Sequence, residues 1–234
     1  MTAAVTGKET TRFGVRPGTI SLKIREPGAA LTHFAALILL LTGTGPLLMR
    51  TKETGASAGR IGMLIFAAAA CFMYAASTVY HTAVAGERLT TILRKIDHSA
   101  ISVMIAGTYT PICLKLLPGK TGTALLAVVW LMAAGGILIK LLWVTCPKAL
   151  SSVLYLSMGW LCVFAMKTIY EAIPLPGFLW LLAGGIFYSV GALIYASRPE
   201  KFDRKHVYFG SHEIFHVFIM LGTFCHYVML YRYC

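Results

Sequence analysis

Seven apolar runs, each long enough to cross a lipid bilayer, constrain this 234-residue chain more than any other feature. A transmembrane helix needs about 20 mainly apolar residues, and such runs cover residues 30–49, 60–81, 98–117, 122–144, 149–167, 178–196 and 211–231. Short segments rich in proline, glycine and charge separate the runs and leave no room for a soluble domain. The sequence therefore predicts an all-α protein, a seven-transmembrane helical bundle formed by residues 29–234 and preceded by a basic cytoplasmic tail at residues 1–28.

The composition supports this class and excludes others. The chain is 57% hydrophobic and only 13% charged, whereas a soluble domain carries about 25% charged residues. Its net charge of +12 is typical of membrane-protein loops that face anionic lipid, and no nucleic-acid-binding motif accompanies it. We expect membrane lipids as partners and no nucleic acid.

Small features refine the picture. The first 28 residues are polar and lack the apolar core of a secretory signal. The six cysteines form no C-x-x-C pair and predict free thiols. Ala134-Gly135-Gly136 and Gly184-Gly185 predict close helix packing.

The positions of lysine and arginine predict an orientation. If the N-terminus is cytoplasmic, 14 of the 21 basic residues fall on the cytoplasmic side. Cytoplasmic loops of membrane proteins carry such an excess. The sequence therefore predicts a cytoplasmic N-terminus and a C-terminus outside.

Ionisable residues inside spans are costly and are candidates for function. Among the acids only Asp97 and Glu213 lie at the start of a span. His81 ends the second span, and His212 and His216 begin the last one. The order of the spans brings these positions to one level of the membrane, at the inner interface. The remaining histidines are expected to be hydrogen-bonded structural residues, with His98 a candidate to orient Asp97; these residues are His33, His98, His206 and His226.

Helical spacing predicts that these polar residues form a candidate metal site. His212 and His216 share one helix face, and Ser77 lies one turn before His81. Three imidazoles from two helices match a catalytic zinc site, which has three protein ligands and one open position. Asp97 would hold and deprotonate a water there. Other interpretations stay open: Asp97 pairs with a neighbouring cation, Ser77 bonds to its own helix, or iron or manganese takes the place of zinc.

Residues 212–216 also spell H-E-x-x-H, a metalloprotease motif in which the glutamate is the base. A protease of this kind needs a further ligand downstream. The extended motif would place glycine at 219 and histidine at 222, but the chain has Ile219 and Gly222, and no acid follows Glu213. We therefore expect the two histidines to bind metal and Glu213 to lie at the membrane interface.

The motifs ASTVYH, IDHSAISVMIAGTYTP and HEIFHVF resemble the hemolysin III family, over about residues 20–231. This family is the bacterial branch of the progestin and adipoQ receptors, which include the adiponectin receptors. The resemblance implies a multi-pass protein of the bacterial plasma membrane. It implies zinc held by His81, His212 and His216, with Asp97 positioning the reacting water and Ser77 beside it.

The resemblance leaves two kinds of function open. One is metal-dependent hydrolysis of a lipid amide or ester, as in the related ceramidases, with a lipid-like substrate. The alternative is a membrane-lytic factor or lipid-sensing receptor in which zinc is structural. A transporter with a histidine-lined ion path is a third option, but spans 4 to 6 offer few charges for one.

Overall fold

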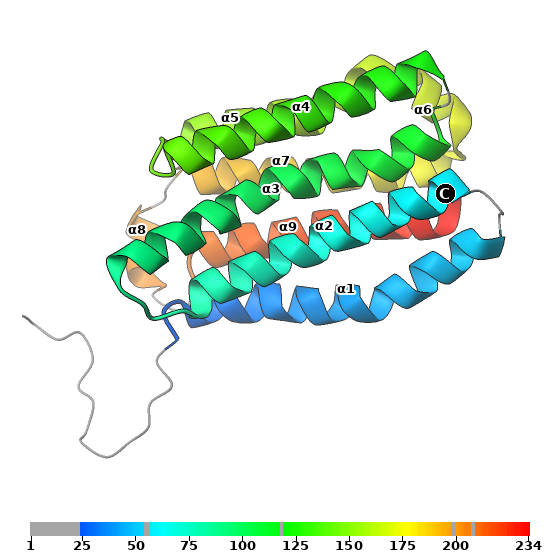
Figure 1. Cartoon of the computed structure of the whole chain (residues 1–234). Coiled ribbons are helices and arrows are strands. Elements are labelled where there is room, and N and C mark those ends of the chain that lie inside the picture. Colours follow the sequence, from blue (N-terminus) through cyan, green and yellow to red (C-terminus); the bar gives the residue numbers. More distant parts are fainter. Residues whose placement is uncertain (1–23, 54–56, 118, 198–199, 207–208) are drawn as a thin grey trace, which may run out of the picture.

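The computed structural model describes residues 24–53, 57–117, 119–197, 200–206 and 209–234. Within these ranges the chain is helical and contains no strand. Figure 1 shows long helices packed side by side in a bundle. The elements are α1 (Pro27–Glu53), α2 (Ser57–Thr82), α3 (Glu87–Lys115), α4 (Lys120–Leu142), α5 (Lys148–Gly159), the 3₁₀ helix η1 (Trp160–Ala165), α6 (Met166–Ala172), α7 (Leu175–Ser197), α8 (Glu200–Lys205) and α9 (Ser211–Tyr233).

Six segments of the described chain are long and apolar enough to cross a membrane. They are α1, α2, α4, α5 with η1 and α6, α7, and α9. The remaining predicted span, α3, is 29 residues long, but charged residues such as Arg94 and Asp97 lower its hydropathy. The multi-pass helical architecture is thus confirmed, while the count of seven spans and the orientation stay predictions.

The distribution of side chains is that of a bundle in lipid. Large apolar residues cover the outside, including Leu131, Leu142 and Phe164, which are 72%, 78% and 87% exposed. Polar residues such as His81, Asp97 and Lys140 are buried inside. Ionisable residues are costly in contact with lipid, so in membrane proteins they face the bundle interior.

The helices close into a ring that brings distant parts of the sequence together. α2 packs against both α1 and α3, and α3 packs against α4. α9 packs against α7 on one side and α1 on the other. Figure 1 shows the end of α2 and the starts of α1 and α9 at the same end of the bundle. This closure places His81 beside the first turn of α9.

The fifth predicted span differs from a regular helix. After α5 the chain tightens into η1 and resumes as α6. A 3₁₀ segment of this kind leaves some backbone groups without their α-helical partners. The Tyr109 hydroxyl of α3 takes up two of them, because it donates to the Gly159 carbonyl and accepts from the Cys162 amide.

The last residues of the predicted tail contact the helical bundle. Residues 1–23 lie outside the described residues, but Arg25 and Glu26 belong to the folded unit. The Glu26 amide donates to the His81 carbonyl at 3.0 Å, and the Arg25 amide to the Thr82 carbonyl at 3.5 Å. A helix end leaves its last carbonyls without partners, so these two residues complete the end of α2.

Candidate metal centre

Three histidine rings meet at one end of the bundle. His81 lies in the last turn of α2, and His212 and His216 lie one turn apart in α9. One ligand atom from each residue lies within 4.8 Å of the other two. The Nε2 atoms of His81 and His212 are 3.3 Å apart. The structure therefore brings together the three residues that the sequence predicts as metal ligands.

The distance between two of the ring nitrogens fits a tetrahedral metal ion. Two nitrogens that each lie about 2.0–2.1 Å from one tetrahedral zinc are about 3.3 Å apart, which matches the His81–His212 separation. His81 and His216 are each only 2% exposed. Imidazoles that face one another in a buried site gain most when a cation lies between them, so the donor set fits zinc or a similar metal.

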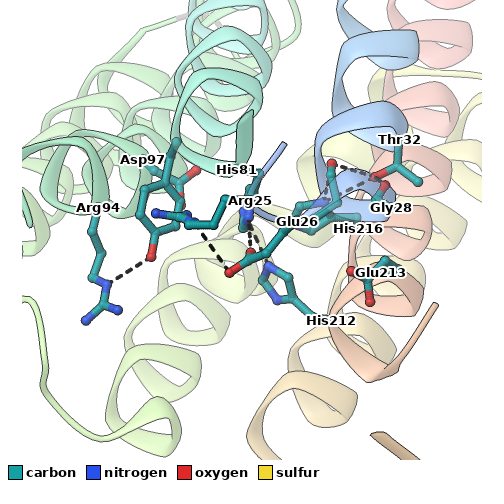
Figure 2. A network of polar contacts seen from close by, with 12 residues as sticks. Arg25, Glu26, Gly28, Thr32, His81, Arg94, Asp97, His212, Glu213 and His216 are labelled. Carbon is teal, nitrogen blue, oxygen red and sulfur yellow. Dashed lines mark hydrogen bonds and ion pairs between the residues drawn. The ribbon is translucent and has the colours of Figure 1, made fainter. Parts of the chain in front are cut away.

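The far side of the His81 ring is held by Glu26. Its Oε2 atom accepts a hydrogen bond from His81 Nδ1, as Figure 2 shows. Burial alone would raise the pKa of the Glu26 carboxyl, but the hydrogen bond and charge of His81, with Arg25 nearby, lower it. Glu26 is therefore a carboxylate that leaves Nε2 of His81 free for a metal, an arrangement common at metal-binding histidines.

His216 is oriented in the same way by α1. Its Nδ1 lies 3.2 Å from the Ala29 carbonyl and 3.3 Å from the Thr32 hydroxyl. The His33 ring stacks on it at 3.6 Å with an interplanar angle of 6°. The carbonyl contact fixes the proton on Nδ1, so Nε2 is the nitrogen available to a metal.

Two carboxylates fix the start of α9 and with it the histidine pair. Asp203 accepts hydrogen bonds from the Ser211 amide at 2.7 Å and the Ser211 hydroxyl at 2.8 Å. Glu213 accepts one from the Gly210 amide at 2.8 Å. Acidic groups at a helix N-terminus satisfy free amides and complement the helix dipole. Glu213 thus caps α9, unlike the catalytic glutamate of a protease motif.

Asp97 reaches the site from α3. It is 7% exposed, and its carboxyl hydrogen-bonds with the Ser77 side chain. Arg94 instead donates to the Tyr80 hydroxyl at 3.0 Å, and within the described ranges Asp97 forms no ion pair with Arg94. The Nε2 atom of His98 lies 3.8 Å from Asp97 Oδ2, too far for a hydrogen bond.

A long cavity begins at this centre. Asp97, Ser77, His212 and His216 line its polar end, and its other walls are mainly apolar side chains of α3, α5, α7 and α9. Along α3 the lining continues to Ile112. Fifteen residues of helix at about 1.5 Å each correspond to about 22 Å, more than the ~15 Å of one bilayer leaflet. The lining of the cavity therefore extends deep into the apolar part of the bundle.

Sequence reasoning missed the contribution of the residues around α1. Glu26 was grouped with the tail and His33 with structural histidines, although the start of the first span lies at the same membrane level as His81. The shared membrane level was the signal in the sequence that could have placed the start of the first span near the metal centre. It could not show that Glu26 faces the His81 ring, because this depends on how the segment before α1 folds onto the end of α2.

The sequence matches a known protein family. The model of a family described as Haemolysin-III related matches residues 22–227. The chain belongs to this family. It is 35% identical over 209 residues to a hemolysin-3 homolog of Bacillus subtilis, covering 89% of this chain and 94% of the relative. With hemolysin-3 of Bacillus cereus the identity is 36% over 200 residues, covering 85% of this chain and 86% of the relative.

More distant relatives connect this haemolysin-III-related protein to the receptor superfamily. Progestin and adipoQ receptor-like protein 1 of Caenorhabditis elegans is 28% identical over 156 residues, covering 58% of this chain and 35% of the relative. No solved structure matches the chain. The matched region contains all three histidines, Asp97 and Ser77, so the candidate centre lies within the part shared with the family.

Proposed function

We propose that this protein is a metal-dependent hydrolase that cleaves a lipid amide or ester inside the membrane. One observation carries the proposal: the His81–His212–His216 cluster, in which His81 and His216 are buried, lies beside Asp97 at the polar end of a long, mainly apolar cavity. A cavity of this kind accepts an acyl chain and excludes bulk water, and its polar end presents the groups needed for metal-assisted hydrolysis.

Each residue has a distinct task in the proposed reaction. His81, His212 and His216 would hold the metal, with Glu26 and the Ala29 carbonyl keeping two of the rings in the required tautomer. Zinc bound there would polarise a carbonyl and lower the pKa of a water toward ~7. Asp97 accepts the proton of the attacking water and returns it to the leaving group. Ser77 keeps the Asp97 carboxyl in place.

The test is hydrolysis by purified, metal-loaded protein with a panel of long-chain amides and esters. Asp97→Asn keeps the shape of the side chain but cannot accept the proton, so we expect a rate about 10²–10⁴-fold lower. Metal content should stay equal to that of the unmodified protein. Glu171→Gln is the matched control, because Glu171 is exposed and pairs with the exposed Lys167 at 3.9 Å.

Release of no fatty acid from any lipid by fully metal-loaded protein would overturn the proposal. Full activity of the Asp97→Asn variant would overturn the role of Asp97 alone.

A second candidate function follows from the names of the Bacillus relatives, hemolysin-3. In this alternative the protein lyses or senses membranes and the metal holds α2 and α9 together. Lysis of red cells that survives Asp97→Asn but is lost with His212→Ala and His216→Ala would favour the structural metal over the hydrolase.

The proposed setting is the bacterial plasma membrane, with seven spans and a cytoplasmic N-terminus. Support comes from the excess of lysine and arginine on that side. In this orientation the metal centre lies just beneath the inner headgroups, where a cleaved polar fragment can leave toward the cytoplasm.

A further inference from the structure

Lys140 is a buried cation outside the metal centre. It lies in the last turn of α4, where a lysine usually extends along the helix to reach water. Its side chain instead turns into the bundle and is only 2% exposed. A buried ammonium is costly unless an opposite charge compensates it.

The partners of this charge among the described residues are neutral or weakly acidic. Lys140 Nζ donates to the Ser151 hydroxyl and to Cys146 Sγ, the latter at 3.1 Å. The centroid of the Tyr155 ring lies 6.0 Å from Nζ. Throughout the part of the chain that the structure describes, no carboxylate forms an ion pair with Lys140. An ammonium has three N–H donors, so one donor and the whole positive charge remain available.

The Lys140 side chain, which carries this free donor, lines the long cavity. Lys140, Ser151 and Tyr155 all line it, and so does His98. The Tyr155 hydroxyl donates to the His98 carbonyl at 2.9 Å, which ties this corner to α3. His98 Nδ1 is buried and has no hydrogen-bond partner in the described chain. Two unused polar groups therefore lie at the same end of a cavity whose remaining length is mainly apolar.

We propose that Lys140, with Ser151, is a binding subsite for the anionic headgroup of a single-chain amphiphile. The apolar length of the cavity takes the chain, and Lys140 takes a carboxylate or a phosphate at its end. The subsite includes none of the three histidines of the metal centre. It operates whether or not the protein hydrolyses a lipid, so it goes beyond the function proposed above.

One competing explanation lies within the cluster itself. Cys146 as a thiolate would neutralise Lys140 without any ligand. Cys146→Ser separates the two ideas, because the hydroxyl of serine does not ionise in this range but still accepts a hydrogen bond. If Lys140 binds an anionic ligand, the Cys146→Ser protein binds it at least as tightly.

The experiment measures binding to purified full-length protein that carries Asp97→Asn, so that no probe is consumed. Three probes share one chain: oleate, oleyl phosphate and the neutral oleyl alcohol. We expect Lys140→Met to weaken binding of at least one of the two anionic probes about 10- to 100-fold, the effect of losing a hydrogen bond to a charged group. Binding of the alcohol should change little.

Two further variants keep the test decisive. Lys167→Met removes a lysine whose side chain is 89% exposed and should leave all three affinities unchanged. Lys140→Arg keeps the charge and should retain anion binding, which covers the case in which Lys140→Met does not fold. Competition by inorganic phosphate assigns the subsite to phosphate headgroups, and its absence with tight oleate binding assigns it to carboxylates.

Equal weakening of acid and alcohol would overturn the proposal, because Lys140 would then act through packing. Loss of anion binding in Cys146→Ser would also overturn it. Neither outcome depends on hydrolysis, so failure here is distinguishable from failure of the proposed enzyme.

Discussion

At the scale of single residues, Glu26 is the residue with the most specific expected effect on the metal centre. It accepts a hydrogen bond from His81 Nδ1, and loss of such a partner typically lowers metal affinity 10- to 100-fold. We expect Glu26→Gln to weaken zinc binding by about that factor, measured by competition with a chelator of known affinity. Glu171→Gln, the same change at an exposed position, should have no effect. Unchanged zinc affinity in Glu26→Gln would show that the contact does not tune the ligand.

Cys146 lies in the loop between α4 and α5. The pH at which its thiol ionises, and so becomes reactive, depends on Lys140. Burial would raise the pKa of the Cys146 thiol, but hydrogen bonds from Ser151 and Lys140 and the ammonium charge lower it. A lower pKa gives more thiolate at a given pH, and the thiolate is the reactive form. In protein whose only cysteine is Cys146, alkylation should reach half its maximal rate at a lower pH than in the same protein with Lys140→Met.

The matched control for this shift is Lys167→Met, which removes the same charge far from the thiol and should leave the pH profile in place. A profile that also stays unchanged in Lys140→Met would mean that the ammonium does not act on Cys146.

Residue spacing predicted part of the centre well. The four-residue interval places His212 and His216 on one face of a helix wherever that helix lies, and the span order sets their level. Partners that follow from loop paths could not be predicted in this way. Asp203 reaches Ser211 only because α8 folds back on the start of α9, and Glu26 reaches His81 only because the segment before α1 pairs with the end of α2.

At the scale of helices, two adjacent glycines of α7 offer a matched pair. A Cβ atom on Gly184 would lie 2.3 Å from His226 Nε2 and 3.1 Å from the Gly222 carbonyl oxygen. A Cβ on Gly185 would meet only Trp160, at an ordinary 3.9 Å. His226 is buried and its Nε2 contacts the Leu181 carbonyl at 3.2 Å, so it cannot move away without losing that contact.

We expect Gly184→Ala to lower the free energy of unfolding by about 1–3 kcal/mol, the usual cost of overpacking. Gly185→Ala should be neutral or slightly stabilising, because alanine favours helix. Thermal unfolding of both variants in the same detergent measures the difference. Equal stability of the two variants would show that α7 and α9 have room to separate.

The predicted elements differ from the observed ones where hydropathy does not determine the bounds or the packing of a helix. Close packing was predicted at both glycine pairs, and it occurs at Gly136 and Gly184 but not at Gly135 or Gly185. The third span was predicted from its apolar residues, whereas α3 begins eleven residues earlier at Glu87. Hydropathy detects the part of a helix that avoids water, while hydrogen bonding continues the helix into its charged first turns. The 3₁₀ segment η1 depends on Tyr109 of another helix, which no local pattern reveals.

At the scale of the whole molecule, the ring of helices explains why the centre is assembled from both ends of the sequence. α1 contacts both α2 and α9, so residues near position 26 meet residues near position 216. A metal held by the three histidines would link α2 to α9, and the contacts from Glu26 and the Ala29 carbonyl tie α1 to both. Metal binding in this arrangement should therefore stabilise the closed ring as a unit and not one helix alone.

Whether α3 crosses the membrane decides the number of spans, and two exposed positions at its ends test this directly. Glu87 begins α3 and Thr121 follows it at the start of α4; both are exposed. In protein whose native cysteines are replaced, we introduce Glu87→Cys or Thr121→Cys and treat intact cells with a membrane-impermeant maleimide. If α3 crosses and the N-terminus is cytoplasmic, Thr121→Cys reacts at once, while Glu87→Cys reacts only after the cells are opened. The inverted orientation exchanges the two results. Reaction of both variants, or of neither, in intact cells would place both ends of α3 on one side, and the bundle would then have six spans with its termini on the same face.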